Sequence, residues 1–324
     1  MIRIVWRNGH RVGRRDFQAE VNLFNHFRAI HSAKGVLDYD LFTPTKGELS
    51  SSVPPMIFLH GLLGNRKNNR SSAKLLAEQL QTPFIVPDLR NHGTSFHASP
   101  MNYKTLSDDL TTLIKHLPST ISRDRGFVIM GHSMGAKVAM IHALRYPGVV
   151  KGVVSIDNVP YTNPEDSLIE FEKFHLGLRT LDWCVKTHPH WSIAEMKEYL
   201  MKWVEPSEKI VTFWLTNIVT KNGRLSSKVP FDILNQSVED ILQWRMEEFG
   251  DLEPLSEQKN VPPLLIIRAN YSKFVGKDVH AHAIGRYFEN YELKPIDAGH
   301  WLVTERKLEF VRIVKEWALS KFNP

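Results

Sequence analysis

One serine stands in a pattern that suits nucleophilic catalysis. The run Gly131-His132-Ser133-Met134-Gly135 fits G-x-S-x-G and lies between four apolar residues, 127–130, and an alanine-rich run, 136–144. A strand, a sharp turn and a helix in that order lift the serine hydroxyl above the sheet edge, at a helix N-terminus whose dipole favours a developing oxyanion. The glycines remove Cβ atoms that would collide in such a turn. The stretch predicts Ser133 as a nucleophile, and the alternative is a small-residue turn without a catalytic role.

A serine nucleophile needs a base, and the base needs an acid that orients it. Of the fifteen histidines, His300 is the one that follows the last predicted strand, in Asp297-Ala298-Gly299-His300-Trp301. Two acids are candidates: Asp157, directly after the apolar run 152–156, and Asp278, beyond the apolar run 264–267. We favour Asp157 because a strand end is held rigidly, as site geometry demands. A turn cap is the alternative role for Asp157.

These residues predict an acyl-transfer mechanism. His300, oriented by Asp157, takes the Ser133 proton, and Ser133 attacks an ester or thioester carbonyl. The Met134 amide and an amide of the His60-Gly61-Leu62 turn, most simply that of Leu62, would hold the oxyanion. A serine at 133, where epoxide hydrolases and dehalogenases use aspartate, argues against their chemistry. The remaining histidines are interpreted as structural or solvated: His60 and His92 as loop braces, His132 as pointing away from the turn, and His280 and His282 as solvated rather than metal-bound.

The elements that must position these residues alternate between strand and helix signals from residue 36 onwards. Short apolar runs at 56–59, 84–86, 127–130, 152–156 and 264–267, and a further predicted strand at about 291–296, are separated by helical patterns, which predicts a mostly parallel, doubly wound α/β sheet. The alternating run 36–42 is expected to form an edge strand. Every motif named above follows one of these runs, at the sheet edge where such folds bind ligands.

Residues 160–254 interrupt the alternation. This region lacks apolar strand signals, reads as helices, and holds five of the eight tryptophans, at positions 183, 191, 203, 214 and 244. We expect a helical cap over the active site. Ordinary surface helices around a small core of their own would account for part of the aromatic content, and a cap also needs an apolar underside.

The positive charge is concentrated at the N-terminus. Residues 1–34 contain seven Lys and Arg against two acids, a net +5 of the total +6. The remainder is nearly neutral, so nucleic-acid binding is not expected. An Arg-rich, acid-poor segment whose phenylalanines can share a helical face resembles a mitochondrial presequence, the alternative being a disordered basic tail. We therefore leave residues 1–34 out of the fold and assign 35–324 to the catalytic domain.

Length and composition allow a substantial core. A chain of 324 residues with 42% hydrophobic content suits one large domain with an insertion. No apolar run approaches the roughly 18 residues that span a bilayer, and no secretory signal is evident, so a soluble protein is expected. The single cysteine, Cys184, excludes an intramolecular disulfide, fits a reducing compartment and is expected in a packed core.

The motifs together resemble a known family. Their order and spacing (His60 to Gly64, Asp88 to Gly93, Gly131 to Gly135, Ile156-Asp157, and Gly299 to Trp301) are similar to those of mitochondrial α/β-hydrolase-domain proteins, in particular the yeast ethanol acetyltransferase group. The resemblance spans about residues 36–320. It implies an α/β-hydrolase fold with the acid at Asp157, whereas Ser272 occupies the non-acidic position after the next strand. Ala136, where relatives often carry glycine, is a departure expected to alter packing behind the turn.

The resemblance also implies an activity. Proteins of this group make ethyl acetate from acetyl-CoA and ethanol in mitochondria, with ester and thioester hydrolysis as side reactions. We accordingly expect small-molecule substrates, acetyl-CoA as acyl donor and no tightly bound cofactor or metal. A plain serine esterase or thioesterase would use the same three residues. A non-catalytic binding module on this fold would have lost one of them, and all three are present.

Overall fold

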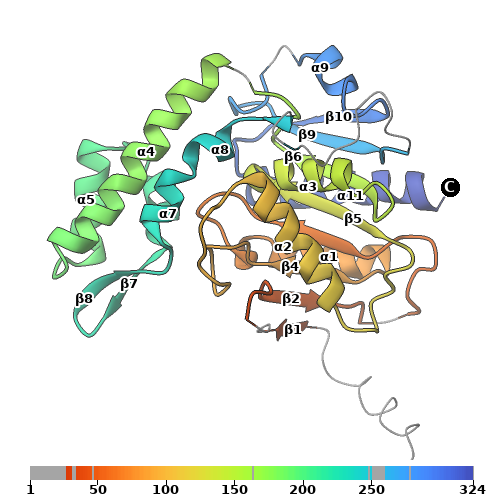
Figure 1. Cartoon of the computed structure of the whole chain (residues 1–324), viewed down its shortest axis with the longest axis horizontal. Coiled ribbons are helices and arrows are strands. Elements are labelled where there is room, and N and C mark those ends of the chain that lie inside the picture. Colours follow the sequence, from red (N-terminus) through yellow and green to blue (C-terminus); the bar gives the residue numbers. More distant parts are fainter. Residues whose placement is uncertain are drawn as a thin grey trace, which may run out of the picture.

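The sheet that carries the candidate residues has eight strands. The computed structural model describes residues 27–30, 34–45, 47–162, 164–246, 249, 260–276 and 279–323 (Figure 1). The spatial order is β1-β2-β4-β3-β5-β6-β9-β10, and β2 is antiparallel to both its neighbours whereas the other pairs are parallel. The strands are β1 (Phe27–Ile30), β2 (Tyr39–Phe42), β3 (Met56–Leu59), β4 (Phe84–Pro87), β5 (Phe127–His132), β6 (Val150–Ile156), β9 (Leu264–Ala269) and β10 (Tyr291–Ile296). The predicted parallel α/β sheet is confirmed.

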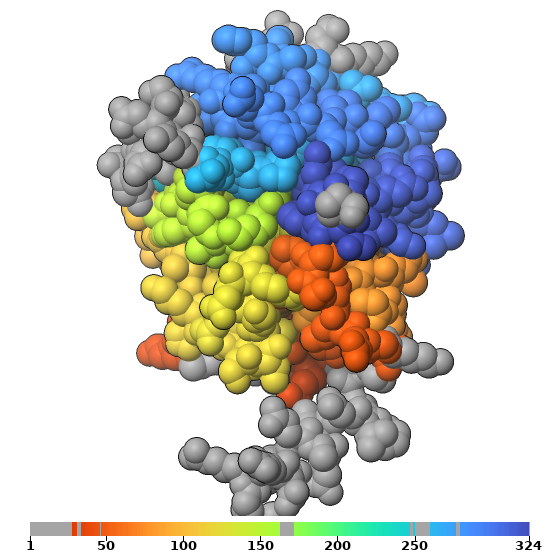
Figure 2. All heavy atoms as spheres, turned by 90° about the vertical axis from the view of Figure 1, so that its right-hand side faces the viewer, coloured from red at the N-terminus to blue at the C-terminus, as the bar shows by residue number. Residues whose placement is uncertain are grey.

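Helices cover both faces of this sheet. Side chains alternate along each central strand: in β5, Ile129 packs in one core and Val128 and Met130 in the other. Helices α2 (Tyr103–His116) and α3 (Met134–Arg145) close the first face, and α1 (Arg70–Leu80) and α11 (Lys307–Phe322) the second. On the face seen in Figure 2, the dark blue C-terminal residues lie beside the orange residues that include α1. The short helices η2 (Arg66–Asn68), α9 (Ala281–Gly285) and α10 (Leu302–Glu305) complete this part.

The segment of the chain between β6 and β9 forms a separate layer, which we call the cap (Figure 1). Its buried side chains, among them Leu181, Met196, Val211 and Leu234, are continuous with the core on the first face of the sheet, and Cys184 is fully buried there as expected. The cap comprises α4 (Pro164–Thr187), α5 (Ile193–Trp203), α6 (Glu208–Leu215), β7 (Ile218–Lys221), β8 (Arg224–Ser227), α7 (Phe231–Gln236) and α8 (Val238–Leu242). Residues 164–171 of α4 are described by their backbone alone, and the rest of the helix with its side chains.

Two expectations about strands need correction. Residues 27–30, placed outside the fold by their charge, form β1, which pairs with β2 from Phe27↔Phe42 to Ile30↔Tyr39. Consequently β2 is not an edge strand, and the run 36–42 contributes only its last four residues. The cap, expected to be helical, also contains the hairpin β7–β8, whose turn residues Asn222 and Gly223 both have positive φ. Residues 1–26 lie outside the described residues.

A buried lysine joins the cap to the main domain. Lys137, on α3, is 4% exposed, and its ammonium group donates to the carbonyls of Leu242 at 2.6 Å and Gln243 at 3.3 Å, where α8 ends. Burial lowers the pKa of Lys137 to about 7. The Tyr103 hydroxyl, on α2, donates to the Ile241 carbonyl beside it. The cap is thus held by polar contacts from two core helices.

Candidate active site

Ser133 lies at the sharp turn between β5 and α3, as predicted. Its backbone has φ 54° and ψ −117°, a strained conformation for a residue with a Cβ. The turn is possible because glycines stand where neighbouring backbone atoms leave no room for a Cβ. A Cβ on Gly131 would lie 2.1 Å from the Gly135 carbonyl oxygen, and one on Gly135 would lie 2.6 Å from the His60 carbonyl oxygen. The Asn158 amide donates to the Ser133 carbonyl at 3.0 Å and so ties the turn to the end of β6.

Gly131→Ala is expected to prevent this turn. The new methyl group would meet backbone atoms of residues 135 and 136, which cannot rotate away as a flexible side chain would. We expect a loss of at least about 4 kcal/mol in the free energy of unfolding, measured by urea unfolding. Gly148→Ala is the matched control, since a Cβ there meets nothing within 4 Å. Equal stability of the two variants would contradict this account of the turn.

His300 and Asp157 meet as the sequence suggested. The Asp157 carboxylate is fully buried, and His300 Nδ1 lies 2.6 Å from its Oδ2 atom, so Nδ1 carries the proton and donates it. Asp157 has φ 53°, and its position is fixed by strand β9, because its amide donates to the Ile267 carbonyl and its Oδ1 accepts from the Ala269 amide at 3.1 Å. The Nε2 atom of His300 is left as the acceptor. Asp278, the alternative acid, lies outside the described residues.

Two neighbours that the sequence did not single out hold the His300 ring and its loop. His132 Nε2 lies 2.7 Å from the His300 carbonyl oxygen, and the two imidazoles contact each other at 4.5 Å between centroids. His132, expected to point away from the turn, thus lies against His300 and lines the pocket. Phe274 stacks on His300, with centroids 4.1 Å apart and rings inclined by 25°. The sequence around Phe274 did not predict this contact, because the contact depends on how the loop after β9 folds.

The loop from His60 to Gly64 lies against Ser133. Gly61 allows this approach, since a Cβ there would lie 3.2 Å from the Ser133 Cβ. His60 accepts from the Leu89 amide at 2.9 Å, and His92 accepts from the Leu63 amide at 3.1 Å, which confirms both histidines as loop braces. Within the described residues the Leu62 amide has no hydrogen-bond acceptor. Met134 is the first residue of α3, where a backbone amide has no acceptor inside its own helix.

Burial keeps several histidines neutral. It lowers the pKa of His60 to about 4 and the pKa of His92, His132 and His142 to about 3, from an ordinary 6.5. His92 is further affected by His60, and His132 by His300, because neighbouring imidazoles disfavour a second positive charge. Neutral rings can both donate and accept, which is how His60 and His92 connect two backbone groups each.

These shifts make stability depend on pH below neutrality. Between pH 6.5 and about 4 the unfolded histidines bind protons that the folded ones exclude, so stability falls as the pH falls through this window. Each such histidine contributes up to about 1.4 kcal/mol per pH unit. We expect the urea midpoint to drop steadily from pH 6.5 to 5, above the range where carboxylates titrate. His142→Gln, on α3 away from the reacting groups, should lower that slope, and an unchanged slope would contradict the prediction.

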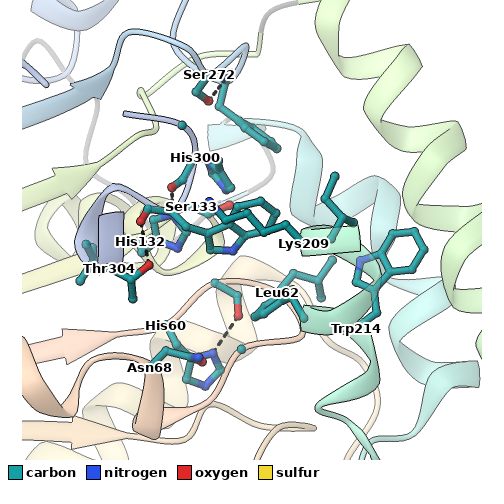
Figure 3. Close-up of a pocket in the computed structure, with 18 of the residues that line it drawn as sticks. His60, Leu62, Asn68, His132, Ser133, Lys209, Trp214, Ser272, His300 and Thr304 are labelled. Carbon is teal, nitrogen blue, oxygen red and sulfur yellow. Dashed lines mark hydrogen bonds between the residues drawn. The ribbon is translucent and has the colours of Figure 1, made fainter. Parts of the chain in front are cut away.

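The candidate residues open into a cavity of about 590 Å³ between the main domain and the cap (Figure 3). Ser133, His300, Leu62 and His132 line it from the main domain. The cap contributes four large apolar side chains, Phe174, Ile210, Phe213 and Trp214, and five polar or charged ones, Lys173, Glu205, Lys209, Thr212 and Thr216. Such a pocket suits a small, largely apolar substrate group with few polar contacts.

In the part of the chain that the structure describes, no set of three His, Cys, Asp or Glu side chains is grouped as a metal site would require. That part includes His280 and His282, whose neighbourhood holds Tyr161. Nor does it contain a helix long and apolar enough to cross a membrane.

The sequence of this chain is similar to those of known proteins. Residues 54–307 match the family described as alpha/beta hydrolase fold. The chain is 32% identical to ethanol acetyltransferase 1 of Kluyveromyces lactis, over 87% of this chain and 79% of that protein. It is also 32% identical to a probable alcohol acetyltransferase of Saccharomyces cerevisiae, over 83% and 79% of the two chains.

Solved structures show the same fold. A marine microorganism esterase superposes with a TM-score of 0.71 at 25% identity, over 87% of this chain and 98% of that one. The thioesterase domain from the curacin biosynthetic pathway gives a TM-score of 0.59 at 16% identity, over 90% and 99% of the chains. The latter likeness concerns the fold alone.

Proposed function

Because the chain belongs to the alpha/beta hydrolase fold family, and within it to the yeast ethanol and alcohol acetyltransferases, we propose that it is an alcohol acetyltransferase that makes acetate esters from acetyl-CoA and ethanol. The observation that carries the proposal is the Asp157–His300 pair, whose histidine lines one pocket with a serine held at a strained turn. The relatives' names supply the acetyl group and the alcohol, and acetyl-CoA is proposed as its donor.

In this mechanism Ser133, His300 and Asp157 form a catalytic triad. His300 Nε2 takes the Ser133 proton while the hydroxyl oxygen attacks the thioester carbonyl, and Asp157 stabilises the imidazolium that forms. The tetrahedral intermediate collapses as the C–S bond breaks, and His300 gives the proton to the departing thiolate of CoA. An acetyl-serine remains. Ethanol then loses its proton to His300 and attacks the acetyl carbon; the bond from that carbon to the Ser133 oxygen breaks, His300 returns the proton to this oxygen, and ethyl acetate leaves.

The amides of Leu62 and Met134 would serve as the oxyanion hole. They belong to the two backbone segments that meet at Gly61 and the turn, and neither has a competing acceptor of its own in the described geometry. Donors fixed in this way are already oriented before charge develops on the carbonyl oxygen, so the transition state needs no reorganisation.

The choice between transfer and hydrolysis depends on water in the pocket. The acetyl-serine is open to ethanol and to water alike, because His300 can deprotonate either. The apolar cap side chains at Phe213 and Trp214 disfavour ordered water while leaving room for a two-carbon alcohol. Ester and thioester hydrolysis are thus side reactions in this proposal.

The basic N-terminus is proposed as a mitochondrial targeting segment. Its support is the sequence alone: five arginines precede the first acid within residues 1–16. Fusing residues 1–26 to a fluorescent reporter tests it, with expected co-localisation with a mitochondrial dye. A diffuse reporter would overturn the proposal. The fusion ends before β1, because that strand is part of the sheet.

The test of the activity uses the purified full-length chain with acetyl-CoA, with and without ethanol. We expect ethyl acetate to form at a rate that rivals the release of acetate, and to rise with ethanol concentration while acetate falls. Acetate alone, undiminished by ethanol, would identify a thioesterase and overturn the proposal. Free CoA is measured alongside as the total turnover.

A further inference from the structure

The cap helix α6 contacts both halves of the candidate active site. At its start, Lys209 forms an ion pair with Glu305, and the Glu305 carboxylate accepts from the Gly299 amide at 2.7 Å, directly before His300. Along its length Ile210, Phe213 and Trp214 line the pocket (Figure 3). Two residues beyond its end lies Asn217, which reaches the loop that carries Leu62.

Asn217 is a buried side chain with a specific long-range partner. It is 2% exposed, and its side-chain amide donates to the Leu63 carbonyl at 2.8 Å, 154 residues away in the sequence. Its own backbone is fixed on both sides, because its amide donates to the Trp214 carbonyl and its carbonyl accepts from the Lys228 amide at 2.8 Å. The cap thus presents one rigidly held donor to the main domain at this point.

Leu63 needs to be held, because its backbone is strained. Its φ is 59°, a left-handed conformation that costs a residue with a Cβ roughly 1–2 kcal/mol. Its amide is fixed by His92 from the main domain, and its carbonyl by Asn217 from the cap. These two contacts fix the peptide planes on either side of Leu63. The plane before it is the one that joins Leu63 to Leu62.

We propose that Asn217 is a positioning residue through which the cap holds the oxyanion loop in its catalytic shape, an inference that rests on the proposed function. Without the Asn217 donor the buried Leu63 carbonyl loses its partner, and Leu63 relaxes toward a negative φ. As Leu63 relaxes, the Leu62–Leu63 peptide shifts, and across the Leu62 Cα it carries with it the Gly61–Leu62 peptide, whose amide moves away from the oxygen on which negative charge develops. The oxyanion hole is therefore completed by the cap and not by the main domain alone.

The test compares Asn217→Leu and Asn217→Asp with Thr187→Val. An ionised Asp keeps the shape of Asn but cannot donate to the Leu63 carbonyl, whereas Leu removes polarity altogether. Thr187 ends the cap helix α4 outside the residues that line the pocket, and its hydroxyl donates to the Trp183 carbonyl of its own helix. Hydrolysis of p-nitrophenyl acetate, the thermal midpoint, and inhibition by a short-chain trifluoromethyl ketone, whose adduct with Ser133 carries an oxyanion, are measured for each variant.

For both Asn217 variants we expect kcat to fall roughly 10- to 100-fold with KM within about threefold, because an oxyanion contact acts in the transition state. The trifluoromethyl ketone should bind more weakly by the same factor as the loss in kcat. Thr187→Val should match the wild type.

A purely structural role for Asn217 would instead lower the thermal midpoint and raise KM while kcat stayed within twofold, and that result would overturn the inference. If the Leu variant does not fold, the Asp variant decides. A wild type without ester-forming activity but with p-nitrophenyl acetate turnover would contradict the proposed function alone, since the oxyanion hole serves both reactions. A wild type inactive in both assays would overturn both proposals.

Discussion

Ser133→Ala is expected to reduce kcat/KM for both ester formation and thioester cleavage by at least about 10⁴-fold, because removing a nucleophile eliminates the covalent route. Folding should be unaffected. Alanine carries the same Cβ at the same positive φ, and within the described residues the Ser133 hydroxyl makes no hydrogen bond that would be lost. Product formation from acetyl-CoA and ethanol, together with the thermal midpoint, measures both effects.

Ser272→Ala is the matched control for this variant. Ser272 also places a hydroxyl in the pocket, but that hydroxyl only accepts from the Phe274 amide in a turn. We expect its activity to stay within about twofold of the wild type, as for most surface changes outside the chemistry. Substantial turnover by a folded Ser133→Ala enzyme would remove Ser133 from the mechanism.

Asp157→Asn should cost about 10³- to 10⁴-fold in kcat, the size of effect seen when a triad aspartate of a serine protease becomes asparagine. The shape of the side chain is kept, so the contact with the Ala269 amide can persist. The amide nitrogen, however, offers a donor where His300 Nδ1 now donates. His300 would then carry its proton on Nε2 and could not accept one from Ser133.

The rate as a function of pH, together with the thermal midpoint, distinguishes this tautomer effect from a general loss of structure. A misoriented neutral imidazole gives a low rate at every pH while the thermal midpoint stays that of the wild type, whereas a general loss of structure lowers the midpoint as well. Asp278→Asn tests the alternative acid and should behave like the wild type. A larger loss at Asp278 than at Asp157 would reverse the assignment.

The nucleophile turn was predictable because its signal is local. Glycines at 131 and 135, an apolar strand before and a helix after are all adjacent in sequence, and their steric reason is visible in the contacts a Cβ would make. The Asp157–His300 contact was predictable for a different reason. Both residues follow strands of one parallel sheet, and the ends of such strands meet at the same edge.

Strand β1 and the hairpin β7–β8 were missed because other signals competed with theirs. Around β1 the arginines of residues 1–34 favoured a targeting segment, and pairing with β2 is a tertiary contact that charge does not report. In the hairpin, Asn222-Gly223 is a recognised turn signal. Each flanking strand has only four residues, too few for a clear alternating pattern amid the surrounding helices.

The contacts made by His132 and Asn217 could not be read from sequence at all. Each is a single side chain that meets a backbone carbonyl more than 150 residues away. A histidine next to a nucleophile or an asparagine after a helix has many ordinary roles, and only the closed arrangement of cap and sheet selects this one. Residues that orient the site are therefore harder to predict from the sequence than the residues proposed to react.

Acetyl-CoA, the proposed substrate, could also acetylate Lys137 directly. Thioesters acylate free amines slowly without any enzyme, and lysine is a common target of acetylation. Lys137 is protected while α8 covers it, at 4% exposure, and becomes reactive only when the cap lifts. Its acetylation, followed by mass spectrometry, would accumulate as a record of every opening. An acetylated side chain is longer and uncharged, so it would not fit back between α3 and α8, and the contacts with the Leu242 and Gln243 carbonyls would be lost.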